Sequence, residues 1–210
     1  MITLRGVTKR FGTQVVLDRF DLDIEEGVVT AVTGPNGSGK TTLARLLLGL
    51  SVPDEGTIDG LDGRRGAMTF QDDRLCEQLT AVGNVRLVLG SSVDPSTVAT
   101  ALRDVGLDGE SLTKPARDLS GGQRRRVAIV RAVLADADLV VLDEPFKGLD
   151  TDAKVQVMDY VLERCAGRTV LLITHDLTEA ERFGARVVTL ASTGRGPDSP
   201  DAGNVTEPSR

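Results

Sequence analysis

The sequence predicts an α/β fold in which a mostly parallel sheet is covered by helices. Short apolar runs rich in β-branched residues alternate with segments whose apolar residues recur at helical spacing. A glycine-rich turn also lies between one such run, residues 28–33, and the helical pattern at 41–50. That order of strand, glycine loop and helix is the context in which a glycine motif indicates a binding site.

The first third of the chain is expected to consist mainly of strands. The run 15–24 alternates apolar and polar positions, as a half-buried sheet requires. The run 28–33 is apolar and β-branched, which is typical of a buried strand. The helix that follows places Leu43, Leu46, Leu47 and Leu50 on one face. In order, strands are expected at 2–7, 15–24, 28–33, 56–58 and 67–70, with a helix at 41–50.

The rest of the chain divides into three parts. Helical spacing dominates from 72 to 118, which we interpret as an inserted helical segment. The final residues, 191–210, are almost without apolar side chains and are expected to form a disordered tail. One domain over 1–190 is therefore predicted. Between insertion and tail, helices are expected at 122–134, 153–164 and 177–183, and strands at 139–142, 170–174 and 186–190.

Composition narrows the class of protein. The net charge of −6 argues against a nucleic-acid partner, and the basic run 124–126 is interpreted as a solvated helical face. Cys76 and Cys165 have no metal-ligand spacing, so a zinc site is not expected. Both cysteines are instead expected to be free thiols in a reducing compartment. The first residues lack the apolar core of a signal peptide, and no apolar run approaches a membrane span. A cytoplasmic location is predicted, with any membrane role supplied by a partner.

The glycine loop fits the P-loop pattern, Gly34-x4-Gly39-Lys40-Thr41. Glycines let backbone N–H groups turn toward the phosphates, and the helix that follows adds its positive N-terminal end. Lys40 is expected to contribute a point charge and Thr41 a hydroxyl ligand to Mg²⁺. The alternative, a chance glycine-rich turn, is disfavoured by the strand and helix on either side. The predicted phosphate-binding residues are Gly34, Asn36, Gly37, Ser38, Gly39, Lys40, Thr41 and Thr42.

Two carboxylates follow the apolar strand expected at 139–142. Asp143, at the strand end, is predicted to reach Mg²⁺. Glu144 is predicted to orient and polarise the water that attacks the γ-phosphate. The alternative is a helix-capping or surface acidic pair, which the presence of a complete P-loop disfavours.

A second anion site is predicted at Leu119-Ser-Gly-Gly-Gln123. A hydroxyl and backbone donors at a helix N-terminus favour a phosphate. One nucleotide cannot easily meet both phosphate-binding ends in one subunit. We therefore expect a two-fold dimer in which each nucleotide lies between the P-loop of one chain and this segment of the other. The predicted contacts are Ser120, Gly121, Gly122 and Gln123.

Together these motifs identify the chain as similar to ATP-binding cassette proteins, the nucleotide-binding subunits of ABC transporters. The resemblance covers residues 1 to about 190, and residues 119–123 match the family's signature sequence without a substitution. It implies a P-loop NTPase fold: a mainly parallel core, an N-terminal antiparallel β-subdomain and an inserted helical subdomain at about 72–118. It also implies an ATPase that uses ATP and Mg²⁺, with Lys40, Glu144 and His175 as catalytic residues.

The resemblance assigns further positions. Phe11 matches the aromatic residue that stacks on adenine, with a core phenylalanine as the alternative. Gln71 matches the glutamine that contacts Mg²⁺ and the attacking water. Asp150 matches a loop that contacts the opposite subunit, and His175 matches a histidine that contacts the γ-phosphate. Residues 146–148 depart from the small residues more usual there, which leaves the contact between subunits open in detail.

The resemblance also implies partners. A homodimer or a pairing with a related subunit is expected, together with a membrane permease, a solute-binding protein and a place on the cytoplasmic face of the cell membrane. Residues 69–75, 79–85 and 143–146 are similar to the nitrate, sulfonate and taurine importer group. Export, import of another solute, and a soluble ABC ATPase without a transport role remain alternatives. A scaffold without turnover would be expected to lose Glu144 or His175, and both are present. The solute itself cannot be identified from this chain, because the permease and binding protein select it.

Overall fold

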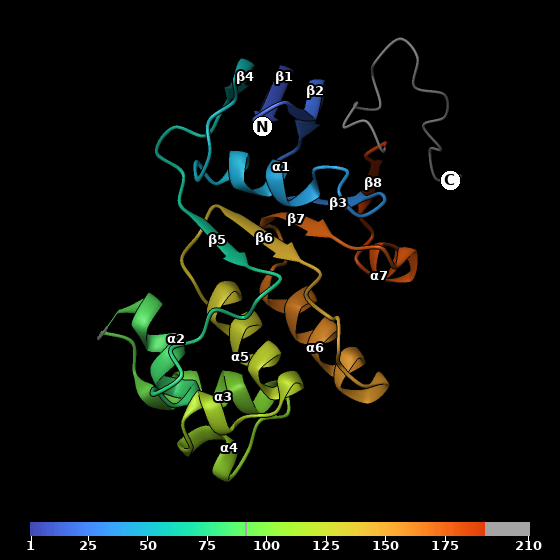
Figure 1. Cartoon of the computed structure of the whole chain (residues 1–210). Coiled ribbons are helices and arrows are strands. Elements are labelled where there is room, and N and C mark those ends of the chain that lie inside the picture. Colours follow the sequence, from blue (N-terminus) through green and yellow to red (C-terminus); the bar gives the residue numbers. More distant parts are fainter. Residues whose placement is uncertain (91, 192–210) are drawn as a thin grey trace. The chain divides into compact units, whose positions relative to one another are not determined.

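The computed structural model describes residues 1–90 and 92–191, so the predicted tail lies, beyond its first residue, outside the described residues. The chain forms two compact units, drawn in Figure 1. One contains residues 1–66 and the described residues from 167 onward, and the other contains residues 67–166. The second unit is larger than the helical segment expected at 72–118, because the elements up to residue 166 belong to it as well.

The first unit contains an antiparallel sheet with the strand order β2-β1-β4. Alternate β1 residues such as Ile2 and Leu4 are fully buried, and they pair with Ile24 and Leu22 of β2. This period of two is what a sheet with one covered face requires. The antiparallel N-terminal part of the predicted fold is therefore confirmed. The strands are β1 (Ile2–Phe11), β2 (Gln14–Ile24) and β4 (Glu55–Asp59).

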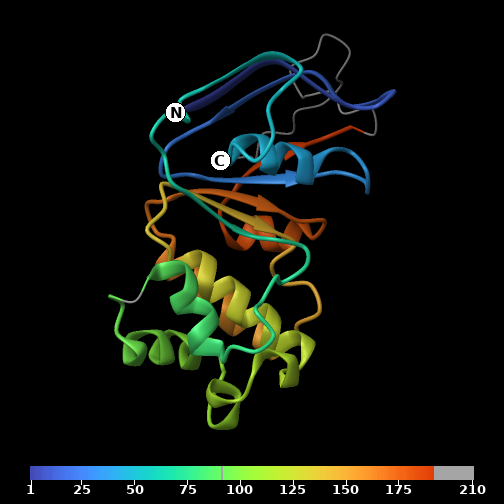
Figure 2. The same ribbon diagram turned by 60° about the vertical axis from the view of Figure 1, so that its left-hand side comes forward.

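The same unit contains three parallel strands in the order β7-β3-β8. All five β7 residues are buried, which suits a strand covered on both faces. Helix α1 contacts β7 and lies beside it in both views (Figures 1 and 2). These elements are β3 (Val29–Thr33), α1 (Lys40–Leu47), β7 (Thr169–Ile173), α7 (Leu177–Arg182) and β8 (Arg186–Thr189).

Helix α1 ends earlier than predicted. Gly49 adopts a left-handed conformation with φ 65°, and the Leu50 N–H donates to the Arg45 carbonyl oxygen at 2.8 Å. Such a glycine-based cap satisfies carbonyl groups at the helix end and stops the helix. Leu50, expected on the apolar helical face, is instead 60% exposed. That part of the prediction was wrong.

The second unit combines two neighbouring strands with a group of helices. Helix α2 contacts α3, α4 and α5, and α6 contacts α3 and α5. Strand β6 is buried along its whole length. No helix of the described residues combines the length and apolar character that a membrane span needs. The elements are β5 (Gly66–Thr69), α2 (Ala81–Leu89), α3 (Pro95–Asp104), α4 (Glu110–Thr113), a 3₁₀ turn (Ala116–Asp118), α5 (Gly121–Val133), β6 (Leu139–Asp143) and α6 (Thr151–Arg164).

The basic run at the start of α5 is not a solvated face throughout. Arg125 is only 5% exposed, so the interpretation of that residue as a solvated charge was wrong. Its side chain lies on the same helical face as Ala128, Ile129 and Ala132, which are buried too. The spacing of three, four and seven residues places all of them on the covered side of the helix.

Candidate nucleotide-binding site

The glycine loop joins β3 to α1 within the first unit. Gly34 has φ 138°, and a Cβ atom there would lie 2.4 Å from the Leu190 carbonyl oxygen, so only glycine fits. Gly39, with φ 99°, is the N-cap residue that immediately precedes helix α1. The Lys40 amino group donates to the carbonyl oxygens of Gly34 at 2.7 Å and Pro35 at 2.9 Å. The loop therefore curls around its own lysine.

Ser38 is the polar side chain that best marks this loop as a ligand site. It is 1% exposed, and its Oγ has no hydrogen-bond partner among the described residues. A buried hydroxyl without a partner is costly, so its presence needs an explanation. A phosphate oxygen would supply the acceptor that this hydroxyl lacks. Together with the glycine-lined loop and Lys40, the residues present fit a nucleotide's phosphates.

The end of β7 lies at the same edge of the sheet as the glycine loop. Ile173 pairs with Val32, and the Thr174 N–H donates to the Val32 carbonyl oxygen at 3.2 Å. The Thr174 hydroxyl then donates to Glu179 at 2.6 Å and accepts from the Asp176 N–H at 3.0 Å. This network fixes the turn that carries the exposed His175. The parallel register thus brings His175 and the glycine loop to one edge of the sheet.

Phe11 lies at the end of β1 and is 50% exposed. The alternative of a core phenylalanine is therefore excluded. The Lys9 amino group lies 5.6 Å from the centroid of its ring. An exposed aromatic face next to a cation is compatible with the predicted stacking on a base.

Asp143 and Glu144 lie in the second unit, at the end of β6. Asp143 is 3% exposed, and its backbone N–H donates to the Thr69 hydroxyl at 3.1 Å. This burial rules out the alternative of a surface acidic pair for Asp143. Glu144 has φ 48°, a left-handed conformation that is uncommon for a residue with a side chain. Strained backbone of this kind is often found at functional sites.

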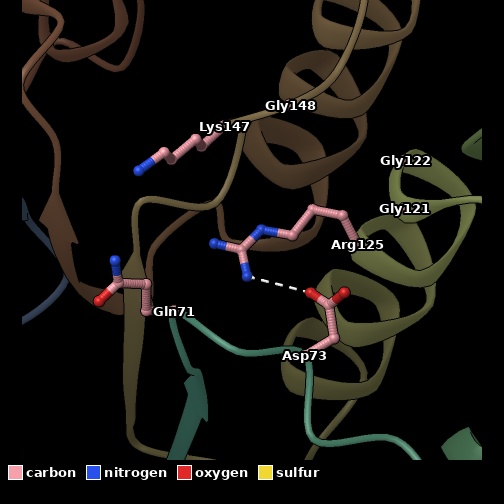
Figure 3. A pocket seen from close by; sticks show the side chains of 7 residues that line it. All are labelled: Gln71, Asp73, Gly121, Gly122, Arg125, Lys147 and Gly148. Atoms are coloured by element: carbon pink, nitrogen blue, oxygen red, sulfur yellow. Dashed lines mark hydrogen bonds and ion pairs between the residues drawn. The ribbon is translucent and has the colours of Figure 1, made fainter.

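A pocket of about 230 Å³ in the second unit brings Gln71 together with the signature glycines (Figure 3). Its wall comes from the segment after β5, from the start of α5 and from the loop before α6. Figure 3 shows Arg125 between Gln71 and Asp73, with Lys147 on the opposite wall. The lining residues are Gln71, Asp73, Gly121, Gly122, Arg125, Lys147 and Gly148.

Three of the predicted contact residues, Ser120, Gln123 and Asp150, also cap helices. The Ser120 Oγ accepts from the Gln123 N–H at 3.2 Å, and the Gln123 side chain accepts from the Ser120 N–H at 3.0 Å. Asp150 caps α6 by accepting from the Ala153 N–H at 2.9 Å. These bonds keep the first turns of α5 and α6 ordered. The Ser120 hydroxyl proton is not used in its cap and remains available as a donor.

The donor set fits Mg²⁺ in chemical type. The hydroxyl of Thr41, the carboxylate of Asp143 and the amide oxygen of Gln71 are hard oxygen ligands, which this cation prefers. The first belongs to one compact unit and the other two to the second.

Sequence reasoning missed Arg125 as part of the site. Arg125 belongs to the basic run 124–126, and three consecutive charged residues are typical of a solvent-exposed helical face. The signal that could have identified it was its spacing relative to Ala128, Ile129 and Ala132, which places it on the apolar face of α5.

A parallel sheet with a glycine loop between β3 and α1, and an acidic pair at the end of β6, defines a P-loop nucleoside triphosphatase. Comparison with known proteins is more specific. Residues 17–147, more than half of the chain, match the family model described as ABC transporter. The chain therefore belongs to the ABC transporter family and is an ATP-binding, ATP-hydrolysing member of it.

Relatives of known role are similar over most of their length. The aliphatic sulfonates import ATP-binding protein SsuB 3 of Paraburkholderia xenovorans (strain LB400) is 41% identical over 91% of this chain and 77% of its own. SsuB 1 of Rhodococcus jostii (strain RHA1) is 40% identical over 92% of this chain and 80% of its own. The Fe(3+) ions import ATP-binding protein FbpC of Mesorhizobium japonicum (strain LMG 29417 / CECT 9101 / MAFF 303099) is 37% identical over 90% of this chain and 57% of its own.

Solved structures agree with the fold. The dimeric bacterial ABC transporter cassette MJ0796 superposes with a TM-score of 0.83 at 27% identity, over 93% of this chain and 96% of that one. A dimeric post-hydrolysis state of the same cassette, bound to ADP and Pi, gives a TM-score of 0.82 at 27% identity over the same shares of both chains. The predicted P-loop NTPase fold is thereby confirmed.

Proposed function

We propose that this chain is the ATP-hydrolysing subunit of an importer, and that it drives a small solute through a partner membrane permease. The observation that carries the proposal is the presence in one chain of a P-loop and of a second helix start, Ser120–Gln123, that fits phosphate. The import roles of the SsuB and FbpC relatives support the direction of transport. The prevalence of aliphatic sulfonate importers among them favours a small sulfonate as the solute.

The first unit holds the nucleotide in this proposal. Backbone N–H groups of residues 34–42, the Ser38 hydroxyl and the Lys40 amino group bind the phosphates. Phe11 stacks on the adenine. Thr41, Asp143 and Gln71 would hold Mg²⁺, which offsets charge on the phosphate oxygens when bound.

Hydrolysis depends on Glu144 and His175. The Glu144 carboxylate orients a water and accepts its proton as the water oxygen forms a bond to the γ-phosphorus. The bond from that phosphorus to the bridging oxygen breaks, and ADP leaves with the bonding electron pair. His175, at the edge of the sheet near the glycine loop, contacts the γ-phosphate and stabilises its charge.

Two chains, or this chain and a related one, pair head to tail in the proposed active state. Each nucleotide then lies between the P-loop of one subunit and the Ser120 segment of the other, with Asp150 contributing to the contact between subunits. Closure of this pair would act on a permease through the helical part of the second unit. This places the chain on the cytoplasmic face of the membrane, with a solute-binding protein on the other side.

The decisive experiment is the substitution Glu144→Gln. We expect the variant to bind MgATP with nearly unchanged affinity, to lose turnover by at least about a hundredfold, and to accumulate as an ATP-bound dimer. Nucleotide binding is measured by fluorescence with a labelled ATP analogue, and the dimer by size-exclusion chromatography with light scattering. Lys40→Ala serves as the control, because it should lose binding and dimer together. Turnover near the normal rate in Glu144→Gln would remove Glu144 from its proposed role.

A second experiment tests the transport role. The chain is coexpressed with a permease and a solute-binding protein of the aliphatic sulfonate importer type, and the complex is reconstituted in proteoliposomes. ATP-dependent uptake of an aliphatic sulfonate is expected. Failure of the chain to associate with the permease, together with the absence of ATP-dependent uptake, would instead favour a soluble ABC ATPase.

A further inference from the structure

We propose that Arg125 is a positioning residue. From helix α5, which begins in the signature segment, its side chain fixes the backbone conformation at both Glu144 and Gln71. The inference rests on the roles proposed above for Glu144 and Gln71. It concerns two segments of the second unit, the 143–145 turn after β6 and the 70–73 segment after β5.

The guanidinium of Arg125 holds the 143–145 turn through three successive carbonyl groups. It donates to the oxygens of Asp143 at 2.7 Å, of Glu144 at short range and of Pro145 at 2.9 Å. Three consecutive carbonyls do not point at one group in an extended strand, since they alternate in direction. They converge here because Glu144 has left-handed backbone with φ 48°. The arginine therefore stabilises the strained conformation that aims the Glu144 side chain.

The same guanidinium holds the 70–73 segment. It donates to the Phe70 carbonyl oxygen at 2.6 Å and to the Asp73 carboxylate at 3.2 Å. Gln71 lies between these two contacts in the chain, and Figure 3 shows the bond to Asp73 within the pocket. Arg131, also on α5, donates to the carbonyl oxygens of Asp73 at 2.7 Å and Arg74 at 2.9 Å. The segment that carries Gln71 is thus bonded to the signature helix on both sides.

The chemistry requires arginine. A guanidinium has five N–H donors in a planar fork, and Arg125 has five acceptors in these two segments. The side chain is 5% exposed, so water does not substitute for a lost partner without rearrangement. Lysine has three donors and glutamine two, and neither spans both segments with the same geometry. A movement of α5 would consequently shift the proposed base and the proposed magnesium ligand together.

The test uses Arg125→Gln, Arg125→Lys and the matched control Arg124→Gln. Arg124 precedes Arg125 on the helix, so the control removes the same charge from the same turn. Steady-state ATPase assays are run at least about 15 °C below each variant's melting temperature, and rates are referred to folded protein measured by circular dichroism. This arrangement separates turnover from loss of stability.

We expect kcat to fall at least about tenfold in Arg125→Gln, with KM for MgATP within about threefold of the wild type. The glycine loop lies in the other compact unit, so ground-state binding of the nucleotide should persist. Arg125→Lys, the milder change, should keep the fold, but its kcat should be only slightly higher than that of Arg125→Gln. Arg124→Gln should retain kcat within about twofold. A positioning role also predicts non-additivity: Arg125→Gln should lower kcat less in a Gln71→Ala background than in the wild type.

Other outcomes overturn the inference. A normal kcat per folded molecule in Arg125→Gln or Arg125→Lys would leave Arg125 a structural residue only. Full additivity with Gln71→Ala would remove the proposed link to Gln71. These failures are distinguishable from failure of the proposed function. An inactive Glu144→Gln beside a normal Arg125→Gln rejects the positioning role alone, whereas an active Glu144→Gln rejects the role of the base itself.

Discussion

Ser120 and Gln123 cap helix α5 by exchanging hydrogen bonds, each side chain accepting from the backbone N–H of the other. The signature segment thus has a local structural role besides its proposed contact with a nucleotide. Substitution of Ser120 changes both properties unless the replacement is chosen to keep one of them.

Ser120→Asp and Ser120→Ala should therefore fail in different ways. Aspartate is a good N-cap residue and should preserve the melting temperature, but its charge repels a phosphate at the same place. We expect Ser120→Asp to bind MgATP as a monomer and to form no ATP-dependent dimer in a Glu144→Gln background. Ser120→Ala should lose about 1 kcal/mol of stability through the missing cap. Thermal melts and light scattering measure the two effects, and a normal dimer in Ser120→Asp would contradict the head-to-tail model.

Ser38 leads to a prediction with opposite signs for stability and binding. Its buried Oγ has no partner among the described residues, so Ser38→Ala should raise the stability of the nucleotide-free protein by about 1 kcal/mol. The same change removes a donor to the phosphates, so the increase in melting temperature caused by MgATP should shrink. Melts recorded with and without MgATP give both quantities.

Thr33→Val provides the control for Ser38. The Thr33 hydroxyl is buried and lies 3.0 Å from that of Thr189, so its removal loses a hydrogen bond and should lower stability by about 0.5–1.5 kcal/mol. A decrease of similar size in Ser38→Ala would show that the Ser38 hydroxyl contributes to the fold of the nucleotide-free protein.

The secondary structure was largely predictable because its signals are local. The apolar run before Gly34 and the apolar run before Asp143 could hardly form anything except buried strands, and both do. Leu50 was placed wrongly because the helical pattern continued past the point where Gly49 ends the helix. The periodicity of leucines contains no information about that left-handed turn.

The site was predictable where a motif fixes its local surroundings and not where it depends on folding at a distance. The glycine loop, Asp143 and Glu144 are next to their strands in sequence. Arg125 donates hydrogen bonds to residues that are 18 to 20 and 52 to 55 positions away in the sequence. The residues next to Arg125 in the sequence do not indicate these partners. The roles of Glu144, Gln71 and His175 in hydrolysis remain predictions that the experiments above test.

Asn84 holds the start of the helical segment and was not recognised from sequence. It is fully buried; its Oδ1 accepts from the Cys76 N–H at 2.7 Å, and its Nδ2 lies 3.0 to 3.2 Å from three carbonyl oxygens. Those acceptors belong to Cys76, Leu79 and Thr80. The amide thus uses both its acceptor and its donors to fold the chain before α2 onto that helix.

We expect both Asn84→Leu and Asn84→Asp to lose about 2–4 kcal/mol of stability near pH 8. Leucine leaves the backbone groups without partners, and an ionised aspartate faces carbonyl oxygens instead of donating to them. Protonation restores one donor to aspartate, so Asn84→Asp should regain stability as the pH falls toward 5, whereas Asn84→Leu should not. Urea unfolding at both pH values measures this, and equal losses at both would contradict the donor argument.

Tyr160 predicts a dependence of stability on pH in the alkaline range. Its side chain is buried, its hydroxyl has no hydrogen-bond partner among the described residues, and burial raises its pKa to about 12. Below an unfolded-state pKa of about 10, both the folded and unfolded forms are protonated, so the group leaves stability unaffected by pH. Between pH 10 and 12 the unfolded state ionises first, and the free energy of unfolding should fall.

The measurement is clean because the chain has one tyrosine and no tryptophan. Absorbance at about 295 nm should report tyrosinate formation near pH 12 in the folded protein and near pH 10 in urea. Tyr160→Phe should be as stable as the wild type at pH 7, or up to about 1 kcal/mol more stable, since it removes an unsatisfied hydroxyl. It should also lose less stability than the wild type between pH 10 and 12. A tyrosinate midpoint near 10 in the folded protein would show that the hydroxyl reaches water.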